Sequence, residues 1–108
     1  MLYDKLRRDL SIYQNTNDGY KINFCIKGKK YTIQPEDILI LEVKDYRNDN
    51  KIVISKTIIG SNYFGFAPSD TEDLDVGYYI YNVKFIESAT GFTYEIISPS
   101  IFWLKAGE

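Results

Sequence analysis

Carboxylates are the most numerous groups in this sequence that could act as acids, bases or metal ligands. The chain has fifteen Asp and Glu residues and no His. Without His it lacks the commonest general base, and neither a Ser-His-Asp nor a Cys-His nucleophile can form. A pair of carboxylates could in principle hydrolyse a glycosidic bond. Most of the acids, however, fall in predicted loops or alternate outward, which favours a role in solubility. We therefore predict no catalytic residues and a protein that is not an enzyme.

The densest cluster of acids could supply oxygen ligands to Ca²⁺, which prefers carboxylates in loops. It comprises Asp70, Glu72, Asp73 and Asp75. The spacing does not match the twelve-residue calcium loop, so we expect a connection between two sheets with Asp75 at its corner. This connection has room for one helical turn, capped by Ser69 or Asp70. The seven Gly residues stand singly, and no phosphate-binding loop is present. The sequence thus predicts neither a metal nor a cofactor.

Composition indicates one ordinary globular domain, which we take to span residues 1–108. The chain is 44% hydrophobic and 26% charged, and its single Cys25 cannot form a disulfide within the chain. The net charge of -2 gives no basic surface for a nucleic acid. Charges near the N-terminus argue against a signal peptide, and no apolar run approaches the ~18 residues of a membrane span. We expect a soluble protein made in the cytoplasm, with no nucleic-acid or membrane partner.

The elements that position any site are predicted to be strands, because hydrophobic residues alternate along most of the chain. Period two is typical of half-buried strands, and it is clearest in residues 20–27, 38–44 and 77–87, whereas residues 51–59 are predicted as a strand from their β-branched runs. Turn-forming residues separate these segments. Seven or eight short strands at roughly 8 to 12-residue spacing predict an all-β protein, in the form of a sandwich of two antiparallel sheets.

Turn and breaker residues lead to three finer expectations. Residues 15–19 are a concentrated turn signal, so we expect residues 9–14 to pair with residues 20–27. Pro99 cannot donate to a ladder, and we expect it to interrupt the last strand. The segment 77–87 should then be the longest strand.

The segment that begins at Asp75 carries the strongest signal of fold. Its pattern, Asp75-x-Gly77-x-Tyr79-x-Tyr81, has the spacing of the corner motif of immunoglobulin domains. In that motif a Tyr at the start of a strand hydrogen-bonds back to the preceding corner, and the residue two places later points into the core. Tyr79 is then the corner residue and Tyr81 a core residue. We predict an immunoglobulin-like antiparallel β-sandwich of seven to eight strands.

If Tyr79 points inward, alternation places Tyr78, Ile80 and Asn82 on the outer face. Trp103 could join this surface or lie in the core. An exposed apolar stripe is typical of a contact with another protein. Exposed aromatic rings can also stack on sugars or unpaired bases. The candidate binding residues are therefore Tyr78, Ile80 and Trp103. The sequence leaves open whether they contact another protein or a ligand on which aromatic rings stack, such as a sugar.

The pattern Asp-Thr-x-x-Leu-x-x-Gly-x-Tyr-x-Tyr-x-Val-x-Phe, together with the final strand, resembles small immunoglobulin-like modules of bacteriophage and prophage structural proteins. It is most similar to the N-terminal domain of Siphoviridae-type baseplate upper proteins from Gram-positive hosts. The matching residues are Asp70, Thr71, Leu74, Gly77, Tyr79, Tyr81, Val83, Gly91, Thr93, Ile96, Phe102 and Leu104. Asn82 stands where Asp is usual. Because members of that family continue into coiled or receptor-binding regions, a chain of this length would be a separate accessory protein of the virion.

This resemblance implies a non-enzymatic structural or adaptor module in the tail or baseplate of a phage or prophage particle. Its partners would be other phage structural proteins, with a homo-oligomer as a further option, and its location would be the virion. The alternative function is a carbohydrate-binding β-sandwich that recognises host cell-surface sugar. That alternative requires two or three coplanar exposed aromatic rings with Asp, Asn or Gln beside them.

Overall fold

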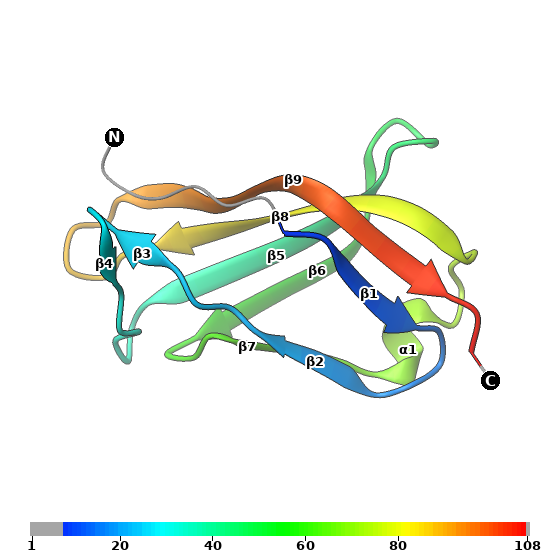
Figure 1. Cartoon of the computed structure of the whole chain (residues 1–108), viewed down its shortest axis with the longest axis horizontal. Coiled ribbons are helices and arrows are strands. Elements are labelled where there is room, and N and C mark those ends of the chain that lie inside the picture. Colours follow the sequence, from blue (N-terminus) through cyan, green and yellow to red (C-terminus); the bar gives the residue numbers. More distant parts are fainter. Residues whose placement is uncertain (1–7, 108) are drawn as a thin grey trace.

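The computed structural model describes residues 8–107, and this part of the chain is all-β, as the alternation predicts (Figure 1). Its elements are β1 (Leu10–Tyr13), β2 (Asp18–Lys21), β3 (Cys25–Ile26), β4 (Lys29–Lys30), β5 (Ile38–Asp45), β6 (Lys51–Ile59), β7 (Tyr63–Phe66), α1 (Pro68–Thr71), β8 (Gly77–Ile86) and β9 (Thr93–Lys105). The predicted domain covers residues 1–108. Residues 1–7 and residue 108 lie outside the described residues. Residues 1–7 include most of the N-terminal segment that was weighed as a signal peptide.

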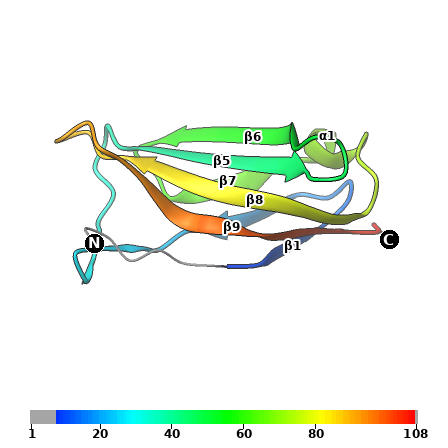
Figure 2. The ribbon, with the colours of Figure 1, turned by 90° about the horizontal axis from the view of Figure 1, so that it is seen from above.

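Five strands form the main sheet, in the order β1-β9-β8-β5-β6. Figure 2 shows them in this order, from β6 at the top to β1 at the bottom. Neighbours in this sheet are antiparallel, except that β1 runs parallel to β9. Two small antiparallel sheets, β2 with β7 and β3 with β4, complete the strand pairing of the described residues.

The β2–β7 pair forms a second layer that packs on the inner face of the main sheet. Phe66 of β7 contacts Phe102 of β9 with ring centroids 5.7 Å apart, and Phe24, just after β2, contacts Phe85 of β8 at 5.0 Å. The buried side chains of both layers belong to one hydrophobic cluster. Burial of each such ring stabilises the fold by roughly 1.5–3 kcal/mol, so these contacts hold the two layers together.

Alternation decides which side chains enter this core. In β5, Leu39, Leu41 and Val43 are fully buried, whereas the residues between them are half-buried on the outer face. In β8, Tyr79 and Tyr81 are buried in the same way, as the corner motif predicts. Successive side chains of a strand point to opposite faces, so each inward residue fixes an outward neighbour.

The predicted pairing of residues 9–14 with residues 20–27 is wrong. The strand β1 pairs with β9, with Leu10 opposite Phe102, and β2 pairs with β7. The turn between β1 and β2 does not close a hairpin because it carries the chain from one layer to the other. Its Asn15 amide donates to Thr71 Oγ1 at 3.0 Å, which anchors the turn to the distant β7–β8 connection.

Pro99 does not interrupt the last strand, and β9, with 13 residues, is longer than β8, with 10. Tyr81 lies opposite Ser100 and Val83 lies opposite Ile97, so two residues of β9 stand opposite Asn82. This bulge takes Pro99 out of the regular ladder, where its missing N–H would otherwise cost a hydrogen bond.

Candidate functional site

The predicted tyrosine corner fixes the start of β8. The Tyr79 hydroxyl donates a hydrogen bond to the Asp75 carbonyl oxygen at 2.6 Å, and Tyr79 is 2% exposed. Burial raises the pKa of Tyr79 above its usual value, although the nearby Arg47 opposes this shift. Tyr81 is also buried, and its hydroxyl donates to the Arg8 carbonyl oxygen. Because both tyrosines are held inward, the side chains of Tyr78 and Ile80 must point outward.

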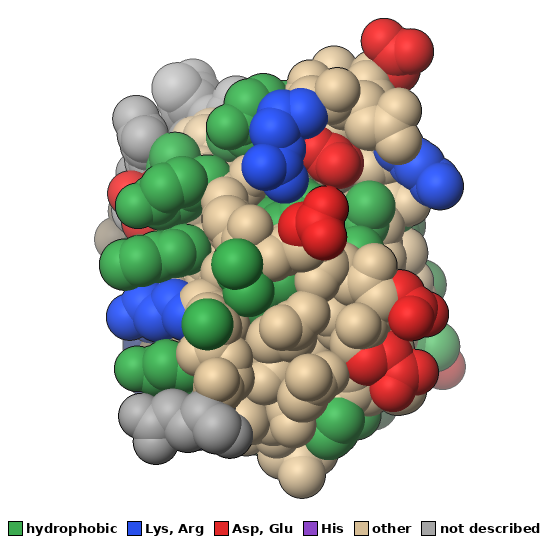
Figure 3. Space-filling view, turned by 90° about the vertical axis from the view of Figure 1, so that its right-hand side faces the viewer, with side chains coloured by type: hydrophobic (Ala, Val, Ile, Leu, Met, Phe, Trp, Pro, Cys, Tyr) green, Lys and Arg blue, Asp and Glu red, His purple; other side chains and the backbone are tan. Residues whose placement is uncertain are grey.

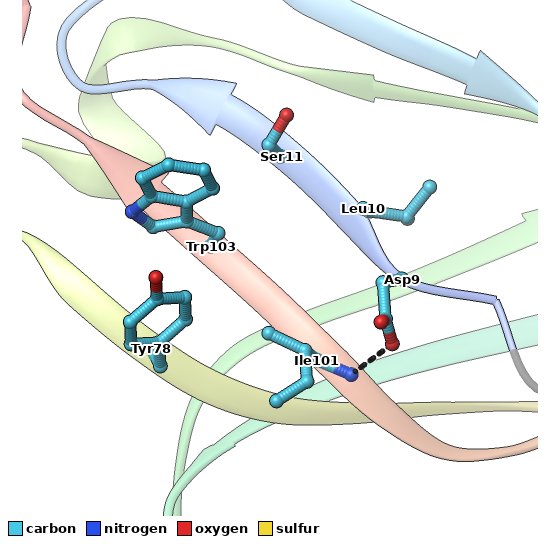
Figure 4. A pocket seen from close by; sticks show the side chains of 6 residues that line it. All are labelled: Asp9, Leu10, Ser11, Tyr78, Ile101 and Trp103. Atoms are coloured by element: carbon cyan, nitrogen blue, oxygen red, sulfur yellow. Dashed lines mark hydrogen bonds between the residues drawn. The ribbon is translucent and has the colours of Figure 1, made fainter.

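Tyr78 and Trp103 lie side by side on that outer face, in register on β8 and β9. Their rings stack with centroids 5.4 Å apart and planes 29° apart, and the two residues are 49% and 40% exposed. Figure 4 shows both side chains beside the same groove. Trp103 is therefore a surface residue. Its neighbours Phe102 and Leu104 are buried, so alternation leaves Trp103 no place in the core.

The stack continues toward β1 through a lysine. Lys105 Nζ lies 4.4 Å from the centroid of the Trp103 ring and 5.5 Å from that of the Tyr13 ring. A cation over an aromatic face is attracted by the ring quadrupole. We call Tyr78, Trp103, Lys105 and Tyr13 the aromatic ladder. Figure 3 shows hydrophobic and basic side chains in a row along one side of the molecule.

The ladder is not a flat platform of coplanar rings. The Tyr78 and Trp103 rings face each other, and Lys105 lies over the Trp103 ring. These contacts occupy ring faces that a sugar would need for stacking. The Tyr78 and Trp103 rings are thus stacked on each other instead of lying side by side in one plane.

A groove of about 440 Å³ runs beside the ladder. It is lined by Asp9, Leu10, Ser11, Tyr78, Ile101 and Trp103 (Figure 4). The Asp9 carboxylate accepts a hydrogen bond from the Ile101 amide at 2.9 Å, which places a negative charge at the groove. The sequence patterns did not identify Asp9, Ser11 or Ile101, because the parallel pairing of β1 with β9 brings them here.

Ile80 shares the outer face with Tyr78 and Trp103, so the structure brings the three predicted binding residues together. Ile80 is half-buried and lies in register with Lys44 on one side and Ile101 on the other. Asn82, which alternation also places on the outer face, is not exposed there. Asn82 is 8% exposed, at the bulge beside Glu95, so the apolar stripe ends at Ile80.

The acidic connection has a structural role in the described residues. Asp70 forms an ion pair with Lys56 at 2.8 Å and accepts a hydrogen bond from the Ala67 amide at 2.8 Å. Burial opposes ionisation of Asp70, but these contacts outweigh it and lower its pKa. The predicted helical turn is present, but its predicted cap at Ser69 or Asp70 is wrong: the helix begins at Pro68 after Ala67, and Asp70 lies inside the helix, where its side chain accepts from the Ala67 amide. Within residues 8–107 no group of three or more His, Cys, Asp or Glu is placed to hold a metal ion.

A second carboxylate is buried at the other end of the main sheet. Asp37 is 1% exposed and accepts hydrogen bonds from the Tyr31 hydroxyl at 2.6 Å and the Gln34 amide at 2.8 Å. Its other oxygen accepts two from Ser88, from the amide and the hydroxyl, both at 2.8 Å. Burial raises the pKa of Asp37, yet the hydrogen bonds outweigh burial and the pKa is lowered. The ionised Asp37 side chain therefore links the segment before β5, which holds Tyr31 and Gln34, to Ser88 in the connection between β8 and β9.

No protein-family model matches this chain, and no curated protein matches it. In the described part of the chain the one helix is the four-residue α1, so no helix there is long and apolar enough to cross a membrane.

Proposed function

We propose that this chain is a non-enzymatic structural or adaptor module of a phage or prophage particle, in its tail or baseplate. It works through protein–protein contacts, and its location is the virion. The observation that carries this proposal is the outer face of β8 and β9, where Tyr78 and Trp103 stand about half exposed beside a groove. A contiguous exposed apolar area of this kind is typical of a protein contact.

In this proposal the two layers form an immunoglobulin-like sandwich. The order β9-β8-β5-β6 corresponds to strands G, F, C and C′ of such domains, and the β2–β7 pair corresponds to B and E. The hydrogen bond from Tyr79 to Asp75 supports the same assignment, because it is the corner contact expected at the start of strand F. Together with the sequence pattern that includes Tyr79 and Tyr81, this supports kinship with the phage modules.

Particle composition tests the function directly. Phage particles are induced from a strain that carries the gene, purified on a density gradient and analysed by mass spectrometry. We expect peptides of this chain in the tail-containing fraction, at a constant ratio to the major tail protein. Absence of the chain from intact particles, while it is present in the cell extract, would contradict the proposal.

The carbohydrate-binding alternative is tested with the fluorescence of Trp103, the only Trp in the chain. Because ring faces at Trp103 are already in contact with Tyr78 and Lys105, we expect titration with host cell-wall polysaccharide to leave its emission unchanged. A saturable change in emission that is lost in Tyr78→Ala would favour the sugar-binding function.

A further inference from the structure

The outer face of the main sheet is apolar at the end that carries the aromatic ladder. Ile80 and Ile101 are opposite each other on β8 and β9, and Tyr78 and Trp103 form the next row of the same two strands. These four side chains give two adjacent apolar rows, and the two aromatic residues are about half exposed. A surface of this composition needs a partner with a matching apolar area.

The charges around these rows are placed symmetrically about the line between β8 and β9. The strand order makes β5 the next strand on one side of this line and β1 the next strand on the other. Lys44 of β5 lies in register with Ile80, and Asp9, next to β1, accepts the hydrogen bond from the Ile101 amide. Since Ile80 and Ile101 are opposite each other, a cation and an anion flank one apolar row at equivalent positions.

We propose that this face binds the same face of a second copy of this chain, with Lys44 of each copy beside Asp9 of the other. A two-fold axis along the line between β8 and β9 lays β5 of one copy over β1 of the other. It brings the two unlike charges together twice and places Tyr78 of each copy on Trp103 of the other. Such isologous contacts are the commonest in homo-oligomers, and facing sheets keep their strand directions within about 30°.

The groove beside Asp9 has the shape and charge that this arrangement needs. The same axis places Lys44 and Ile80 of the second copy over the groove, whose lining includes Ile101 and Trp103. The apolar stem of a lysine packs along such a surface while its ammonium group reaches a carboxylate. The groove therefore accepts the side chains that the symmetry delivers to it.

A second pair of charges follows the same symmetry and identifies the partner as a copy of this chain. Lys84 and Glu95 are opposite each other on β8 and β9, on either side of the same line. The axis places Lys84 of one copy beside Glu95 of the other. Each of the two rows carries one lysine and one acid. A uniformly acidic or basic partner would pair with only one of these charges in each row, whereas a second copy pairs with both.

This inference rests on the proposed function as a protein-binding module and names the partner. The two can fail separately, because the presence of the chain in particles does not depend on whether it pairs with itself. Analysis of particle composition tests the function, and association of the purified chain tests the contact.

Exchange of charges tests the contact. Lys44→Glu places two acids together at both contacts, and Asp9→Lys places two lysines together. We expect each variant to raise the Kd of the dimer at least about tenfold in sedimentation equilibrium. An equal mixture of the two variants should dimerise again, because every contact then joins unlike charges. Acrylamide quenching of Trp103 should fall whenever the dimer forms.

The control is Lys21→Glu, the same charge change on an exposed residue of β2 in the other layer, which should leave the dimer unchanged. Asp9→Asn keeps the acceptor for the Ile101 amide and removes only the charge, so it should weaken the dimer less than Asp9→Lys. Circular dichroism shows that each variant is folded. The proposal is overturned by a chain that stays monomeric at its highest soluble concentration, or by a dimer that neither charge exchange weakens and the mixture does not restore.

Discussion

The two ends of the main sheet meet their surroundings in opposite ways. At the end where β5 begins, the Asp37 carboxylate is buried and each oxygen accepts two hydrogen bonds from the same chain. At the end where β8 begins, Tyr78 and Trp103 stand about half exposed. A buried charge and an exposed apolar area are the two informative departures from ordinary burial. The hydrogen bonds of Asp37 are completed within the chain, and we call this the closed end of the sheet. The other, open end leaves apolar area exposed, as the proposed contact requires.

The largest effect is expected from Asp37→Ala at the closed end. The change leaves the donors of Tyr31, Gln34 and Ser88 without their acceptor, so the free energy of unfolding should fall by at least about 3 kcal/mol. Urea denaturation followed by Trp103 emission measures it. The matched control is Asp73→Ala, at an exposed acid, which should change stability by less than about 0.5 kcal/mol. Equal effects of the two variants would show that the Asp37 hydrogen bonds do not hold this end together.

Acid should weaken the closed end through the same carboxylate. The hydrogen bonds hold the folded pKa of Asp37 below its usual value of 3.8. Its contribution is therefore complete above pH 3.8 and is lost as the pH falls through the folded pKa. We expect the free energy of unfolding to fall between about pH 4 and pH 2, and to fall less steeply in Asp37→Asn. Identical slopes in the two proteins would assign the acid sensitivity to other groups, such as Asp70.

A smaller effect is expected from Tyr79→Phe, which removes only the corner hydrogen bond to the Asp75 carbonyl oxygen. Loss of one such bond, with the ring still buried, should lower the free energy of unfolding by about 1 kcal/mol. The control Tyr46→Phe removes a hydroxyl from an exposed residue and should have almost no effect. If both variants unfold at the same urea concentration as the unchanged chain, the corner bond does not stabilise β8.

The smallest effect on stability is expected from Tyr78→Ala at the open end. Tyr78 is 49% exposed, so its loss should change the free energy of unfolding by about 0.5 kcal/mol. The Trp103 ring loses its stacked neighbour, however, and its emission should shift to longer wavelength. A large loss of stability would show that this end, too, is mainly structural, and the contrast between the two ends would disappear.

Local sequence patterns predict which side chains of a strand face the core and which face outward. Alternation predicts β5 and β8, β-branched runs predict β6, and the spacing from Asp75 to Tyr81 predicts the corner hydrogen bond. The pairing of β1 with β9 was missed, because nothing in residues 9–14 records which distant strand they join. Pro99 was misread for the same reason, since the bulge that accommodates it depends on the partner strand.

The candidate site shows the same division. Tyr78 and Ile80 were found by their position next to Tyr79, and of the two places left open for Trp103, core or surface, the structure shows the surface. Asp9 and Lys44 were missed as part of this surface, because they reach it through strand order. The Asp37 network was missed as well, since Ser88 lies 51 positions away in the sequence.

The ion pair between Lys56 and Asp70 bears on how far assembly can proceed. Lys56 is opposite the buried Leu41, so this charge of the edge strand β6 points toward the interior side of the sheet and is held there by Asp70. A further strand added to β6 would have to accommodate that charge, and inward-pointing charges of this kind discourage fibres built from strand after strand. Addition of a strand is thereby disfavoured at the β6 edge, so this edge favours assembly through the faces of the sheet over extension of the sheet itself.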